Sequence, residues 1–126
     1  ESEFEVPIEI FSGEICPAEA LCKYLREQKE MRFSDIARLI NRDQRTVWIS
    51  YRNASLKETE FNIKNRKATV SVEIFANRNT SILESLIYYL RERGFTNVEI
   101  SHLLNKDPRN TWTIYSRAAR KMAKIS

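Results

Sequence analysis

The sequence predicts a mainly α-helical protein of two tandem three-helix units, each preceded by a short β-strand. The chain aligns with itself at an offset of about 64 residues, which indicates two copies of one unit. In the first predicted helix of each copy, apolar residues recur at three- and four-residue spacing, the period of a helix. Only two Gly and three Pro occur in 126 residues, which disfavours a many-stranded sandwich or barrel. We expect the first unit at residues 1–58, a linker or hairpin at 59–69 and the second unit at 70–126.

Each copy opens with an alternating segment. Apolar residues alternate over residues 6–10 and again over residues 70–74, and this period of two predicts a strand in each copy. Two arrangements are open at this point. The strands can pair with each other and join the copies in one rigid body, or residues 58–69 can act as a linker between separate units.

A helix follows each strand. Its apolar residues have helical spacing and are expected in the core: Leu21, Cys22 and Leu25 in the first copy, and Ile82, Leu83, Leu86 and Leu90 in the second. In the second copy Gly94 favours a helix stop, and Thr96-x-x-Glu99 is a capping box that begins the next helix. Ser34 takes that place in the first copy, without the acid.

Each copy then holds a short helix, a turn and a second helix. Asn41 and Asn105 lie in the turns, and Asn tolerates the left-handed conformation that ends a helix. Asp43 and Asp107 are predicted N-caps, because an Asp carboxylate accepts the free amides of a first helical turn. Pro108 is the preferred first residue of a helix. The helix boundaries therefore recur in both copies.

This pattern resembles the helix-turn-helix superfamily, and most closely the compact domains of sigma-factor region four and of LuxR-type regulators. The likeness is carried by Ile36-Ala37-Arg38-Leu39-Ile40 and Thr46-Val47, and in the second copy by residues 100–104 and 117–122, which look most like the sigma form. It covers roughly residues 18–57 and 82–123. The chain departs from the pattern in having Asn at the turn instead of Gly, a Trp in each second helix and a strand ahead of each unit.

The resemblance implies that the second helix of each pair enters the major groove of DNA. Gln there can bond adenine and Arg can bond guanine. The candidate base-facing residues are Gln44, Arg45, Ile49, Arg52, Arg109, Asn110, Thr113 and Ser116. The candidates for phosphate contacts are Ser34, Arg38, Arg42, Thr96, Lys106, Arg120 and Lys121, with Lys124 extending the second basic strip. An alternative for Arg45 and Arg109 is an ion pair with the nearby cap residue.

Other side chains of the two copies have more ordinary expectations. Trp48 and Trp112 have a helical phase at the border of the core, so we expect them to pack rather than to stack on DNA. Tyr51 and Tyr115 are expected in the core. His102 corresponds to Arg38, which indicates a position facing solvent or phosphate rather than a catalytic one.

Positive charge is concentrated at corresponding places in the two copies. Residues 1–22 hold six Glu and no Lys or Arg. Residues 23–57 hold nine basic against four acidic residues, and residues 88–126 hold eight against three. This distribution favours a polyanionic partner more than the modest formal charge of +4 does.

The sequence disfavours enzymes, metal proteins and membrane proteins. It offers no nucleophile with a nearby base and no phosphate-binding glycine loop, and its two Cys and one His form no zinc ligand set, so we expect no catalytic residues, no metal, no cofactor and no small-molecule substrate. With no membrane span or signal peptide, a cytoplasmic, nucleoid-associated protein is expected.

Double-stranded DNA is the expected partner, read by two recognition helices from one chain. The half-sites would be related but not identical, about 34 Å apart. The alternative is a module that docks a protein or self-associates through a strand edge. RNA is a weaker third option, because the patterns of the common RNA modules are missing.

Overall fold

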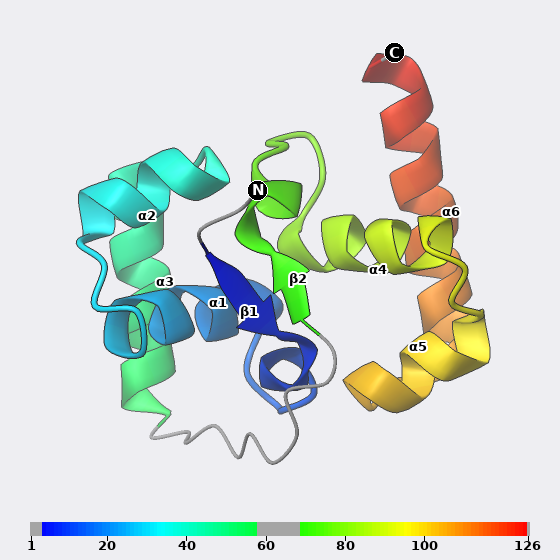
Figure 1. Ribbon diagram of the computed structural model, residues 1–126, viewed down its shortest axis with the longest axis horizontal. Coiled ribbons are helices and arrows are strands. Elements are labelled where there is room, and N and C mark those ends of the chain that lie inside the picture. Colours follow the sequence, from blue (N-terminus) through cyan, green and yellow to red (C-terminus); the bar gives the residue numbers. More distant parts are fainter. Residues whose placement is uncertain (1–3, 58–68, 126) are drawn as a thin grey trace.

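Two groups of three α-helices flank a two-stranded ribbon (Figure 1). The computed structural model describes residues 4–57 and 69–125. The first group follows strand β1 (Glu5–Pro7) and consists of α1 (Pro17–Glu27), α2 (Phe33–Ile40) and α3 (Gln44–Leu56). The second follows β2 (Thr69–Ser71) and consists of α4 (Ile82–Glu92), α5 (Asn97–Leu104) and α6 (Pro108–Ile125). The predicted fold class is confirmed for these residues. The linker or hairpin expected at residues 59–69 lies outside the described part of the chain, except for Thr69, which begins β2.

The ribbon relates the two copies by a local two-fold pseudosymmetry. β1 and β2 pair antiparallel, with Val6 opposite Val70 at the centre of the register. These two valines are equivalent in the repeat, so the two strands pair symmetrically about the same residue of each copy. Of the two arrangements that the sequence left open, the paired one is therefore observed.

The strands are shorter than the alternating pattern predicts. After three residues each chain winds into a short 3-10 helix, η1 (Ile8–Phe11) and η2 (Val72–Phe75). In a 3-10 helix residues three apart share a side, which directs Phe11 and Phe75 into the core. Their ring centroids are 5.7 Å apart, so a second pair of equivalent residues meets between the copies. The expectation that the strands continue through residues 10 and 74 was wrong, because the apolar spacing of these segments fits both a strand and a 3-10 helix.

The two copies share one core. η1 packs on its own α1 and on α5 of the other copy, and η2 packs on α4 and on α2. The fully buried side chains come from both copies, among them Leu21, Leu25, Leu86 and Ile87. The positions of the two α2–α3 and α5–α6 pairs are therefore fixed relative to each other through the ribbon.

Arg42, in the turn after α2, also joins the copies. Its guanidinium donates to the carbonyl oxygens of Thr80, at 2.9 Å, and of Phe75, at 3.3 Å. Burial and the nearby Arg78 lower the pKa of Arg42 from its ordinary value. These bonds hold the turn of the first copy against the second.

The predicted helix ends are observed, with corrections at Ser34 and at Asp43. Asn41 (φ 56°) and Asn105 (φ 54°) are left-handed, as is Gly94 (φ 98°) after α4. The Thr96 hydroxyl and the Glu99 carboxylate form the expected capping box. Ser34 does not take the cap position of α2, because the helix begins at Phe33 and its N-cap is Arg32, two residues before Ser34. The residue equivalent to Thr96 is Arg32, which pairs with Asp35 instead.

The two Asp residues ahead of α3 and α6 behave differently. The Asp107 carboxylate accepts a bond from the amide of Arg109 at 2.7 Å. Asp43 occupies the N-cap position of α3, but its carboxylate accepts no cap bond. The start of α6 therefore has both a side-chain cap and a first-turn proline, whereas α3 begins with neither.

Candidate nucleic-acid interface

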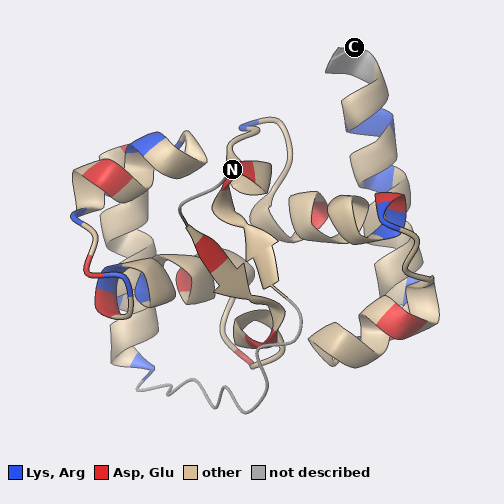
Figure 2. Ribbon diagram, viewed as in Figure 1, with Lys and Arg blue, Asp and Glu red and all other residues tan. Residues whose placement is uncertain are grey.

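The last helix of each group is basic and contains no acidic residue. α3 carries Arg45 and Arg52, and α6 carries a longer basic series, Arg109, Arg117, Arg120, Lys121 and Lys124. The other four α-helices each contain Asp or Glu, which Figure 2 shows in red on the ribbon. Among the described α-helices, only the equivalent helices α3 and α6 thus carry basic residues without any acidic residue.

The candidate base-facing residues lie along one side of these helices. On α3, Gln44, Arg45, Ile49 and Arg52 are all exposed; on α6, Arg109, Asn110 and Thr113 are exposed and Ser116 is half-buried. The opposite side is held in the core by Val47 and Ala54 in α3 and by Thr111 and Ala118 in α6. The two helices therefore present the same face to solvent.

Trp48 and Trp112 belong to this exposed face. Their side chains are 47% and 58% exposed, so the expectation that they pack at the border of the core was wrong. Successive residues of a helix are rotated by about 100°, and Val47 and Thr111 take the buried positions one residue earlier. The Arg52 guanidinium lies 5.7 Å from the centre of the Trp48 ring. Each recognition candidate thus exposes one indole at the same place.

The candidate phosphate contacts separate into two sets. Arg38, Thr96 and Arg120 are exposed, and Ser34 and Lys106 are half-buried. The other two, Arg42 and Lys121, are half-buried and bonded within the protein, Arg42 to carbonyl oxygens of the second copy and Lys121 to Glu84. Arg45 and Arg109 take part in none of the ion pairs found among the described residues, and His102 is exposed.

An ion pair anchors the end of the basic helix in each copy. Lys57, just after α3, bonds Glu19 of α1 at 2.7 Å, and Lys121 of α6 bonds Glu84 of α4 at 2.8 Å. The bond to Glu19 raises the pKa of Lys57. Burial favours neutral Glu84, but the bonds from Lys121 and from the Ser81 amide outweigh it and lower the pKa of Glu84. The pairs link the end of each basic helix to the first helix of its own unit.

A tyrosine makes a second repeated bond between the same helices. The Tyr51 hydroxyl donates to Glu27 at 2.9 Å, and Tyr115 donates to Glu92 at 3.5 Å. Both rings are half-buried and pack against the core, so they are less buried than expected. Sequence reasoning missed these contacts and the ion pairs, although all eight residues recur at the offset of the repeat and so offered a signal.

Cys22 is buried and bonded to Ser50, and burial raises the pKa of its thiol to about 12. It therefore acts as the small hydrophobe that the sequence predicts.

Within residues 4–57 and 69–125, no helix combines the length and the apolar character that a membrane crossing requires. No family model, curated protein or solved structure matches the chain.

Proposed function

We propose that the protein is a sequence-specific double-stranded DNA-binding protein, a transcriptional regulator with two helix-turn-helix units in which α3 and α6 are the recognition helices. The observation that carries the proposal is the matched exposed face of these helices. Each presents an arginine in its first turn and an indole one turn on, free of acidic residues. Residues at such positions in a groove-bound helix reach base edges.

The side chains on that face suit the contacts that a major groove offers. Arg45 and Arg109 can each bond both acceptors of a guanine, and Gln44 can bond adenine. Trp48 and Ile49 give apolar surface for thymine methyl groups or sugars. The exposed cations Arg38 and Arg120 suit phosphates, which set position without reading sequence.

The pseudosymmetry bears on how half-sites would be arranged. α3 and α6 lie on opposite sides of the ribbon and run in opposite directions (Figure 1). Two antiparallel recognition helices match the local two-fold symmetry of duplex DNA, so the half-sites should be inverted rather than direct repeats, about 34 Å apart. The halves should differ, because Ile49 corresponds to Thr113 and Arg52 to Ser116.

The test is selection of binding sites from a random duplex pool, followed by affinity measurements at two salt concentrations. We expect an enriched motif whose affinity falls steeply as salt rises, because phosphate contacts release counterions. A selection that enriches no motif, with only feeble binding to any duplex, would contradict the proposal.

Protein docking is the second candidate function, and one observation favours it. Leu56, at the end of α3, is 69% exposed and lies seven residues after the exposed Ile49, on the same side of the helix. Under this function the duplex selection enriches nothing. A peptide-display selection would instead yield a ligand whose binding is lost when Ile49 and Leu56 are both replaced by Ala.

A further inference from the structure

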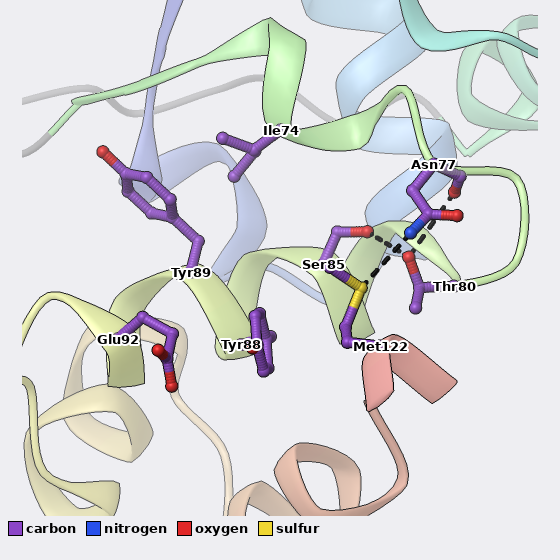
Figure 3. A pocket seen from close by; sticks show the side chains of 8 residues that line it. All are labelled: Ile74, Asn77, Thr80, Ser85, Tyr88, Tyr89, Glu92 and Met122. Carbon is purple, nitrogen blue, oxygen red and sulfur yellow. Dashed lines mark hydrogen bonds between the residues drawn. The ribbon is translucent and has the colours of Figure 1, made fainter. Parts of the chain in front are cut away.

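The second copy contains a cavity that the candidate DNA surface does not use. It has a volume of about 230 Å³ and lies among η2, the segment after it, α4 and the last turns of α6 (Figure 3). Its walls are the rings of Tyr88 and Tyr89, with Ile74 and Met122. An apolar cavity of about 150 Å³ suffices for a benzene ring. The space therefore fits a molecule with one aromatic ring and a short substituent.

The two ends of the cavity differ in chemistry. At one end the hydroxyls of Thr80 and Ser85, both buried, lie 2.7 Å apart, and the Asn77 amide bonds the Met122 sulfur at 3.2 Å. Glu92 lies at the other end, apart from this polar cluster (Figure 3). No Lys or Arg belongs to the described lining. The site thus offers hydroxyls at one end and a carboxylate at the other.

The first copy serves as an internal comparison. Ile15 stands where the second copy has Thr80, and Ala20 where it has Ser85, and both are buried. Burying a hydroxyl costs free energy unless it is bonded, and the same framework packs with apolar residues there. Tyr24 is 2% exposed, whereas its counterpart Tyr89 is half-buried because it lines the cavity. The buried hydroxyls of Thr80 and Ser85 and the partial exposure of Tyr89 are therefore specific to the second copy.

We propose that this cavity binds a small aromatic molecule that carries a hydroxyl or amine group and no negative charge. The ring lies between the tyrosines, Ile74 and Met122, its hydroxyl bonds Thr80 and Ser85, and an amine faces Glu92. A bound ligand touches α4, and it touches α6 through Met122. This proposal holds whether or not the protein binds DNA, because every described residue of the lining belongs to the second copy and none is a candidate DNA contact.

The test uses three probes of similar size: tyramine, 4-ethylphenol and 4-hydroxyphenylacetate. Each is titrated into the full ¹⁵N-labelled chain and followed by amide shifts. We expect tyramine and 4-ethylphenol to shift the amides of Ser85, Tyr89 and Met122. The carboxylate probe should bind at least about ten-fold more weakly, because it brings a second negative charge toward Glu92.

Variants separate this site from weak general binding. Thr80→Ile with Ser85→Ala installs the residues of the first copy and should abolish binding, with folding checked by circular dichroism. The control, Ala20→Ser, adds a hydroxyl at the matching place in the first copy and should leave binding unchanged. The proposal is overturned if none of the probes binds, if the carboxylate binds as well as the amine, or if the folded double variant binds like the wild type.

Discussion

Arg45 and Arg109 are the second residues of α3 and α6, exposed and outside every ion pair of the described residues. If both helices read bases, Arg45→Ala and Arg109→Ala should each weaken binding to the selected duplex by about 1–3 kcal/mol. Fluorescence anisotropy measures the affinities. Lys29→Ala, an exposed change off this face, controls for lost charge. Arginine variants that bind no worse than this control would exclude base reading by these residues.

The exposed indoles give a second prediction at this scale. Trp48→Ala and Trp112→Ala should change the free energy of unfolding by no more than about 0.5 kcal/mol, because neither side chain fills the core. Both should lower DNA affinity. Urea unfolding and anisotropy on the same samples test the two statements. A destabilisation of about 3 kcal/mol, typical of a core Trp, would place the indole inside the protein instead.

Single residues show where the sequence suffices and where it does not. Asn41, Asn105 and the Thr96–Glu99 box were predictable because caps depend on local bonds within one turn. The exposure of Trp48 was not, because a one-residue change of helical phase decides whether Val47 or Trp48 faces the core, and the packing partner of α3 is distant in sequence.

At the scale of elements, the contact between α4 and α6 depends on pH through Glu84. The folded-state pKa of Glu84 is below its ordinary 4.5, so its contribution to stability is complete above that value and is lost as pH falls through the folded-state pKa. Glu84→Gln should cost about 1–2 kcal/mol at pH 7, since Lys121 is 40% exposed and the pair partly screened. It should also flatten the acid loss of stability.

Urea unfolding between pH 7 and pH 3 measures this effect. Glu73→Gln, at an exposed carboxylate of η2, is the matched control. An equal slope in the Glu84 and Glu73 variants would show that the ion pair does not contribute to acid stability.

Element lengths were harder to predict than element types. Residues 8–11 fit both a strand and a 3-10 helix by their apolar spacing, and the three-residue pairing of β1 with β2 ends the ladder at Pro7. That register depends on contact between residues far apart in the sequence. Local patterns could therefore place a strand before each group of helices but could not give its length or its partner.

At the scale of the whole molecule, the antiparallel pairing of β1 with β2 at equivalent valines predicts how the two half-sites of the target DNA are oriented. A duplex in which the two selected half-sites are inverted should bind at least about ten-fold more tightly than a duplex with the same half-sites in direct order. In the direct order only one of α3 and α6 can engage its half-site correctly. A single half-site is the control and should match the direct repeat. Equal affinity for both orders would contradict a two-fold docking mode.

Hydroxyl-radical footprinting on the selected duplex tests most directly whether α3 and α6 read DNA together. We expect two protected patches on one face of the duplex, about one helical turn apart. Arg45→Ala should weaken one patch and Arg109→Ala the other. A single patch, or loss of the same patch in both variants, would contradict reading by two recognition helices.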